Sequence, residues 1–177
     1  VIVTDFGHGL ISPKIIEYLC ENAPFLAVNV QTNAGNHGFN LATRYPKVDF
    51  LCIDVPEARL AVSDKYANMS TLVAELLPNK IDSNCFIVTH GHQGCITYQR
   101  ESDTVHRIPA ITDQVVDTVG AGDAFFAVAA PLVRASGSVE LAGFLGNVAG
   151  AIKVGIVGHR KAVEKIPLTK FVTGILK

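Results

Sequence analysis

Apolar runs typical of buried strands alternate with helix-like segments along most of this chain. Such runs cover residues 1–3, 25–30, 48–53 and 85–89. Two parallel strands of one sheet need a long connection between them, which is usually a helix and nearly always crosses over in the right-handed sense. The alternation therefore predicts an α/β fold, with a mostly parallel sheet and helices on both of its faces.

A further pair of strands departs from this alternation. Residues 95–98 and 105–108 are strand-like and are separated by the polar segment 100–104, which predicts an antiparallel hairpin in an otherwise parallel sheet. Pro131 lies inside a helix-like segment and is expected to kink that helix or to end its regular part. Helices are predicted at residues 13–22, 55–62, 71–77, 121–134, 139–154 and 168–176.

Composition excludes several classes of function. The 15 basic and 16 acidic residues are well mixed along 177 residues, so the chain has no electrostatic footprint for nucleic acid or for an anionic membrane. No apolar run reaches membrane-spanning length and no signal peptide opens the chain, which makes the cytoplasm the default location. The scattered cysteines favour reduced, buried thiols over disulfides or zinc. The length suits a single domain, residues 1–177.

The stretch 116–126 turns from a glycine-bearing loop into an apolar, helix-like run. Gly120 and Gly122 let the backbone turn sharply and approach a ligand closely. The open N–H groups at the start of the following helix would hold an anion, above all a phosphate. Asp123 lies in that first turn, where it could accept a proton from a hydroxyl group. The local pattern leaves a second interpretation open, in which Asp123 only offsets the helix dipole and the glycines form a tight turn.

Residues 117–123 resemble the second signature of the ribokinase-like (phosphofructokinase-B-type) sugar kinases. The resemblance implies a three-layer α/β/α ribokinase-like fold and ATP-dependent phosphoryl transfer to a sugar hydroxyl. It implies that Gly120, Ala121 and Gly122 form the anion hole for the transferred group, and that Asp123 is the base. The resemblance covers only the C-terminal part of the family members. Their N-terminal part, with the lid and most sugar-binding residues, is therefore expected to be absent here.

Asp54 and Glu57 lie three residues apart at a predicted helix start. Two carboxylates near phosphate groups suit a Mg²⁺ ion that keeps several waters, whereas the local alternative is a capping box within the helix. The resemblance places here the family's Asn-x-x-Glu motif, which is tied to magnesium and nucleotide phosphates. Because Asp54 replaces the Asn, the metal role stays plausible, while direct phosphate contact by this residue is less expected.

A glycine-bearing turn follows the strand that ends at Thr89. His90 and His92 suggest a metal site, but no third ligand at suitable spacing accompanies them, and a turn between two strands is the favoured interpretation. Under the resemblance, Thr89-x-Gly91-x-x-Gly94 matches the family loop whose backbone lies against the nucleotide.

Asn147 is a polar residue in a helix-like run of small residues, where it is either a satisfied core amide or, as the resemblance favours, a contact to adenine. The resemblance also extends nucleotide binding to Asp117 and Thr118. In many family members, carbonyl groups of a turn corresponding to residues 154–159 and of the signature itself hold a monovalent cation, and Asp117 and Val119 would be the counterparts here.

Residues 5–9 follow the first strand, at the edge where open α/β sheets bind ligands. Asp5 and His8 are therefore candidates for the edge of the site, although a plain strand-to-helix turn is slightly favoured. Residues 31–40 hold three Asn; their amides could bind phosphate or sugar, but a solvated loop is the safer interpretation. Residues 5–9 also resemble the heptose-phosphate branch of the family, whose members are often fused to a nucleotidyltransferase domain.

These features bear on three functions. Phosphoryl transfer from ATP to a sugar or sugar phosphate, with Mg²⁺ and in many members a monovalent cation, is the first; the resemblance also allows a homodimer. The second is a nucleotide-binding module without catalysis, since the sugar-binding part is expected to be absent. Dinucleotide-dependent oxidoreduction is disfavoured because no Gly-x-Gly-x-x-Gly follows the first strand.

Overall fold

Six strands lie side by side in one sheet, in the order in which they occur along the chain. The computed structural model describes residues 1–112, 114–158 and 160–177, so His159, at the end of the predicted 154–159 turn, lies outside the described residues. The strands are β1 (Ile2–Asp5), β2 (Ala27–Val30), β3 (Phe50–Asp54), β4 (Cys85–Thr89), β5 (Cys95–Gln99) and β6 (Thr104–Ile108).

The first four strands run parallel, with Ile2 opposite Ala27, Ala27 opposite Phe50, and Phe50 opposite Cys85. Strands β5 and β6 are neighbours joined by only residues 100–103, a connection that is long enough for an antiparallel pair but too short for a parallel one. The predicted hairpin is therefore present.

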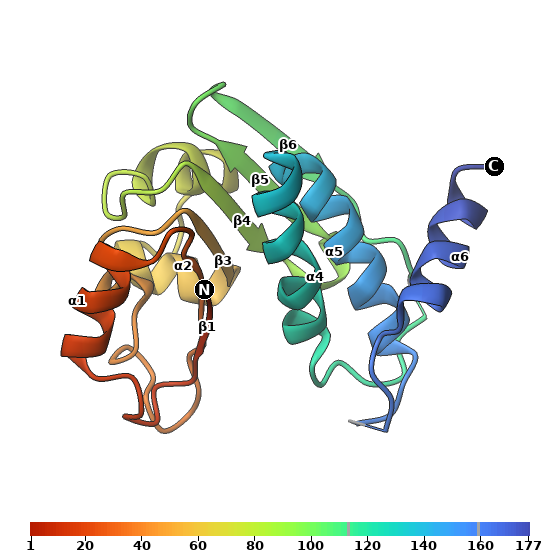
Figure 1. Cartoon of the computed structure of the whole chain (residues 1–177), viewed down its shortest axis with the longest axis horizontal. Helices are drawn as coiled ribbons and strands as arrows, with labels where there is room; N and C mark the ends of the chain where they lie inside the picture. Colours follow the sequence, from red (N-terminus) through yellow and green to blue (C-terminus); the bar gives the residue numbers. More distant parts are fainter. Residues whose placement is uncertain (113, 159) are drawn as a thin grey trace. The chain divides into compact units, whose positions relative to one another are not determined.

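The chain forms two compact units. The first unit comprises Val1–Thr89 and Ile96–His106, and the second comprises His90–Cys95 and Arg107–Lys177. That the whole chain is one domain stays a prediction. The first unit contains α1 (Pro13–Asn22), η1 (Ala42–Arg44), α2 (Val55–Val62), α3 (Met69–Thr71) and η2 (Leu72–Leu76), and the second contains η3 (Gly91–Gln93), α4 (Ala121–Ser136), α5 (Val139–Val154) and α6 (Lys165–Ile175) (Figure 1).

The core of the first unit forms on one face of the sheet. Alternate strand positions, such as Val28, Leu51 and Phe86, pack in one cluster with helix residues that include Ala58 and Leu72. Because side chains of a strand alternate between its faces, these positions belong to one side of the sheet. Burial of such a cluster is the main stabilising contribution to folding.

Helix starts follow their capping signals, and one helix differs from the prediction. Ser12 accepts a hydrogen bond from Ile15 N at the start of α1. The helix predicted over 71–77 begins at Met69, because Asn68 caps it by accepting from Ser70 N. It then continues as the π-type turn η2, in which Leu77 N donates to Leu72 O over 3.0 Å.

Helices α4 and α5 of the second unit lie side by side (Figure 1). A Cβ atom built on Gly146 would lie 2.8 Å from the Phe125 ring, so only glycine permits this approach. Helix α4 continues through Pro131 to Ser136, so of the two effects expected of Pro131, a kink or an end of the regular helix, the end does not occur. The buried residues on both sides of Pro131 hold the helix in place despite the donor that proline lacks.

Among the described residues, no helix is long and apolar enough to cross a membrane.

Candidate functional site

The loop before α4 is fixed by its first acidic residue. The Asp117 carboxylate accepts hydrogen bonds from Val119 N at 2.9 Å and from Gly158 N at 2.7 Å. The backbone N–H groups of Val116 and Asp117 both donate to Val154 O, at 2.9 and 3.0 Å. The side chain of Asp117, expected to contact the nucleotide, therefore binds backbone groups that join this loop to the end of α5. The local pairing with Val119 is an Asx-type turn that sequence alone could have indicated.

Helix α4 begins without a side-chain cap. Gly120 is its N-cap residue, in the left-handed region with φ +76°, and a glycine has no side chain with which to accept a hydrogen bond from the first turn. Ala121 N donates to Thr118 O over 3.2 Å, and the next two amides belong to Gly122 and Asp123. A helix start of this kind offers N–H groups and the positive end of the helix dipole to an anion.

Gly122 has no structural reason to be glycine. Its φ lies outside the left-handed range, and a Cβ atom built on it would meet no described atom within 4 Å. It is exposed, and it lies in the first turn of α4 beside half-buried Asp123. Gly120, in contrast, needs its positive φ. The structure thus brings Gly120, Ala121, Gly122 and Asp123 together at one helix start, where Gly122 is exposed and the other three are half-buried.

The turn after β4 contains two glycines with different surroundings. Gly94 has φ +84°, and a Cβ atom there would lie 2.1 Å from Ile108 O, so packing requires glycine. Gly91 has φ +51°, is exposed, and would meet nothing within 4 Å. His90 N donates to Gly94 O at 2.7 Å and closes the turn. This leaves the Gly91 backbone as the part of the turn that a ligand can approach.

No metal centre accompanies the two histidines near that turn. Over residues 1–112, 114–158 and 160–177, no group of three or more His, Cys, Asp or Glu side chains could hold a metal ion.

The Asn147 side chain is half-buried and its amide nitrogen is already used. Nδ2 donates to Ile108 O at 3.2 Å and to Pro109 O at 3.1 Å. It also lies 3.7 Å from Cys95 Sγ. These bonds join α5 to the end of β6, so a contact from Asn147 to a nucleotide would come from its Oδ1 atom.

In the first unit, Asp54 and Glu57 form a capping box at the start of α2. Asp54 accepts from Glu57 N at 2.8 Å, and Glu57 accepts from Asp54 N at 2.9 Å. The other Glu57 oxygen accepts from Thr32 N at 2.9 Å. Asp54 also pairs in register with Thr89 across β3 and β4. Three predicted site residues therefore lie together at the carboxyl ends of adjacent strands.

Burial changes the acid–base behaviour of this pair. It raises the pKa of Glu57 to about 7, with the neighbouring Asp54 charge adding to the effect. Burial also raises the pKa of Asp54. Each carboxylate oxygen that accepts one N–H group keeps a lone pair. The donor set therefore fits a Mg²⁺ ion that keeps most of its waters, once both groups are ionised.

Asp5, a candidate for the edge of the site, is enclosed instead. The residue is only 4% exposed. One oxygen accepts from Gly7 N at 2.9 Å, and the other accepts from Tyr45 Oη at 2.9 Å and pairs with Arg44 at 3.2 Å. Arg44 also donates to Asn40 Oδ1. Burial and the Asp5 carboxylate together raise the pKa of Tyr45. These contacts give Asp5 a structural role.

Side chains of the asparagine-rich loop hold it in place, while residues 34, 35 and 37–39 are exposed, as expected for a solvated loop. The side chains of Asn33 and Asn36 donate to Phe6 O at 3.0 and 2.8 Å, and Asn36 and Asn40 are buried. Asparagine amides can replace backbone hydrogen bonds in loops, and this is the signal that sequence reasoning missed. His8 stays exposed and stacks on Phe6.

The family model described as pfkB family carbohydrate kinase matches residues 15–166. The bifunctional protein HldE of Geotalea uraniireducens is 25% identical over 160 residues, covering 89% of this chain and 32% of that protein. HldE of Koribacter versatilis is 27% identical with the same coverage. The chain thus spans about a third of the length of these relatives.

Solved structures show the same fold. Ribokinase from Thermotoga maritima has a TM-score of 0.77 at 17% identity, over 97% of this chain and 56% of that chain. Arabidopsis thaliana ribokinase, complexed with ribose and ATP, has the same TM-score and identity, over 97% and 55%. The predicted ribokinase-like α/β fold is confirmed.

Proposed function

Because the chain belongs to the pfkB family of carbohydrate kinases, we propose that it transfers the γ-phosphoryl group of ATP to a hydroxyl group of a sugar or sugar phosphate. The observation that carries this proposal is Gly122. Its backbone conformation and its surroundings would both accept a side chain, and glycine in a helix costs up to about 1 kcal/mol relative to alanine. A ligand that must approach the amide closely accounts for glycine at this position.

The start of α4 supplies the groups that phosphoryl transfer needs. Backbone N–H groups of Gly120, Ala121 and Gly122 would donate to the oxygens of the transferred phosphoryl group, where negative charge accumulates. The Ala121 N–H group would exchange its bond to Thr118 O for one of these oxygens. The acceptor hydroxyl oxygen bonds to the γ-phosphorus while the bond from phosphorus to the bridging oxygen of ADP breaks. Asp123 takes the hydroxyl proton, and such a base contributes roughly 10²- to 10⁴-fold to the rate.

The remaining predicted residues bind the nucleotide and its metal. The Thr89–Gly94 turn offers the exposed Gly91 backbone, Thr118 lies in the loop before α4, and Asn147 offers Oδ1. Mg²⁺, held by Asp54 and Glu57 through its waters, would supply positive charge beside the phosphate oxygens. Asp117 positions the loop through its backbone contacts.

The acceptor that we favour is a heptose phosphate. Residues 5–9 resemble that branch of the family, and the HldE proteins of Geotalea uraniireducens and Koribacter versatilis are similar to this chain. The same proposal includes a fused nucleotidyltransferase domain in the whole protein, a homodimer and a cytoplasmic location. We also propose that this chain corresponds to the C-terminal portion of such a kinase.

Gly122→Ala tests the proposal, with Gly174→Ala as its matched control. Gly174 is also a helical, exposed glycine without a positive φ and with open space around it. We expect both variants to unfold at the wild-type temperature or slightly above it, since alanine favours a helix by up to about 1 kcal/mol. Only Gly122→Ala should weaken ADP binding, measured by calorimetry, and slow phosphorylation in a coupled assay with a panel of sugars.

Unchanged ADP affinity and turnover in Gly122→Ala would contradict the anion hole. ADP binding without turnover on any sugar of the panel would instead favour the nucleotide-binding module.

A further inference from the structure

Lys153 is a buried lysine at the end of α5. It is only 5% exposed, although lysine is almost never buried without a partner. It follows the stripe of buried small residues Ala142, Gly146 and Ala149 along the helix. Gly146 on this stripe lies against Phe125 of α4, so the spacing of three to four residues directs Lys153 toward α4 as well.

The ammonium group of Lys153 binds the turn that follows α5. Nζ donates a hydrogen bond to Gly158 O. The N–H group of the same glycine donates to the Asp117 carboxylate at 2.7 Å. A buried ammonium group and a carboxylate therefore lie on the two sides of one residue, and both orient it.

The same turn is bonded to the loop before α4. Val154 O, one residue beyond Lys153, accepts the N–H groups of Val116 and Asp117. A Cβ atom built on Gly150, one helical turn before Lys153, would lie 3.9 Å from Ala121 O. Lys153 therefore belongs to the hydrogen-bonded support of the loop and helix start that carry the proposed anion hole.

These contacts do not fit a monovalent cation held by the turn and the loop. Such an ion needs several carbonyl oxygens directed at it, yet Gly158 O is directed at an ammonium group and Val154 O accepts two backbone N–H groups. A second positive charge beside a buried ammonium group would also be repelled. Two carbonyl groups of the turn expected to bind the ion, Val154 O and Gly158 O, are therefore bonded to groups of the protein itself.

We propose that Lys153 is a built-in cation: its ammonium group holds residues 117–122 in place, so that the protein requires no bound monovalent cation at this turn. Lys153 is a positioning residue, since it acts through Gly158 and Asp117. The inference rests on the proposed function only where ADP affinity is the readout.

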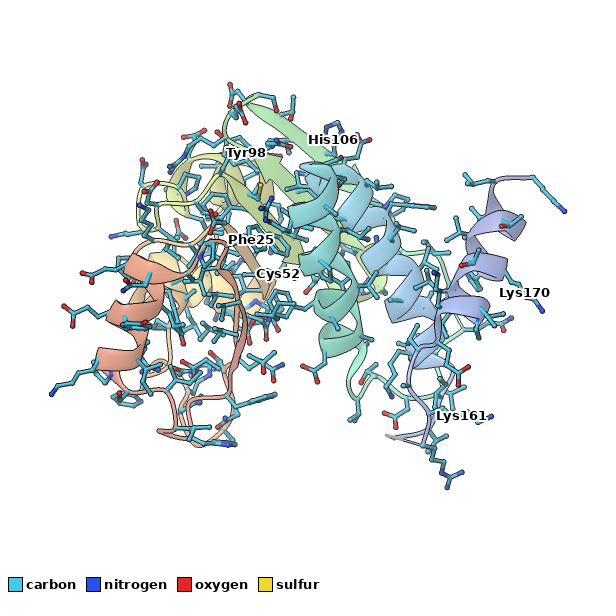
Figure 2. All side chains as sticks on the ribbon, viewed as in Figure 1. Phe25, Cys52, Tyr98, His106, Lys161 and Lys170 are labelled. Atoms are coloured by element: carbon cyan, nitrogen blue, oxygen red, sulfur yellow. The ribbon has the colours of Figure 1, made fainter. Side chains whose placement is uncertain are left out.

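The test compares salts and variants. Wild type, Lys153→Met and Lys170→Met are assayed in KCl, NaCl and tetramethylammonium chloride at equal ionic strength, by thermal unfolding and by ADP affinity. Lys170 is an exposed lysine of α6 (Figure 2), and its variant removes one charge without touching the turn. We expect the wild type and Lys170→Met to be indifferent to the salt. Lys153→Met should unfold at a lower temperature and bind ADP about 10- to 100-fold more weakly, the usual effect of losing a group that orients a site.

Two results would overturn the proposal. One is a saturable stabilisation of the wild type by K⁺ over tetramethylammonium, which needs no variant and so remains decisive if Lys153→Met does not fold. The other is Lys153→Met behaving like Lys170→Met in both measurements. Failure of the proposed function has a different signature, namely no turnover on any sugar or no ADP binding, while the unfolding temperatures still decide the role of Lys153.

Discussion

Two helix starts that carry predicted site residues are built in opposite ways. At α2, Asp54 and Glu57 close the helix start with reciprocal side-chain bonds to backbone N–H groups. At α4, the N-cap is Gly120, which has no side chain with which to cap the first turn. The acidic residue before α4, Asp117, directs its carboxylate to Val119 and Gly158 outside that turn.

The difference shows how one structural element can favour opposite charges. The capping box places buried carboxylates at α2, which attract a cation and repel phosphate. The glycine cap leaves amides and the positive end of the dipole at α4, which attract phosphate. We therefore propose that the metal binds at the first helix start and the transferred phosphoryl group at the second. Two predictions test this proposal at the two helix starts, and a third tests the ion pair of Asp5 in the first unit.

The largest effect is expected for Asp123→Asn at the open helix start. The variant removes the proton acceptor but keeps the size of the side chain, so turnover should fall roughly 10²- to 10⁴-fold. ADP affinity should stay close to wild type, because the amides of α4 remain. A coupled kinase assay and calorimetry measure the two quantities. Glu164→Gln, at an exposed position, is the control and should leave both unchanged. Near-normal turnover in Asp123→Asn would show that another group takes the proton.

Loss of the ion pair between Arg44 and Asp5 in the first unit should lower the free energy of unfolding and leave turnover unchanged. Arg44→Met leaves the Asp5 carboxylate, 4% exposed, without its ionic partner. Removal of one member of a buried ion pair usually costs about 3 kcal/mol or more. We expect about 3 kcal/mol in urea unfolding, since Tyr45 and Gly7 still donate to Asp5.

The exposed pair Arg100–Asp82, at 3.0 Å, provides the control for that measurement. Asp82→Asn should cost less than about 1 kcal/mol, because solvent screens an exposed pair. Equal losses of unfolding free energy in Arg44→Met and Asp82→Asn would mean that the Asp5–Arg44 pair stabilises the first unit no more than an exposed ion pair does.

The same contrast explains what could be predicted from the sequence. Strand runs, helix caps and the hairpin depend on local patterns, so the order of elements and the parallel sheet followed from them. The capping box at Asp54 and Glu57 is equally local, and the sequence indicates it as the alternative to a Mg²⁺ site. The start of α4 was located because Gly120 and Gly122 are adjacent to an apolar helix.

What could not be predicted depends on contacts between distant residues. Asp5 meets Arg44 and Tyr45 across about 40 positions of the chain, and no local pattern signals such a pairing. The same holds for Gly158 and Asp117, 41 positions apart. Continuation of α4 through Pro131 depends on buried residues on both sides of the proline, whereas propensity alone favours a break.

The smallest effect is expected at the closed helix start, in the pH dependence of stability. Because burial raises the pKa of Glu57 from 4.5 to about 7, the folded state holds a proton in this range that the unfolded state releases. Stability contributed by the protonated group is therefore present below about pH 4.5 and is lost as the pH rises through 7. The loss should be of the order of 2 kcal/mol in urea unfolding.

Glu57→Gln should lack this pH-dependent loss of stability, while Glu75→Gln, at an exposed carboxylate, should keep the wild-type slope. Mg²⁺ affinity in the presence of ADP should rise over the same range, since a carboxylate binds the ion only when ionised. An unchanged slope in Glu57→Gln would mean that Glu57 is ionised throughout, and the two helix starts would then differ in geometry but not in proton binding.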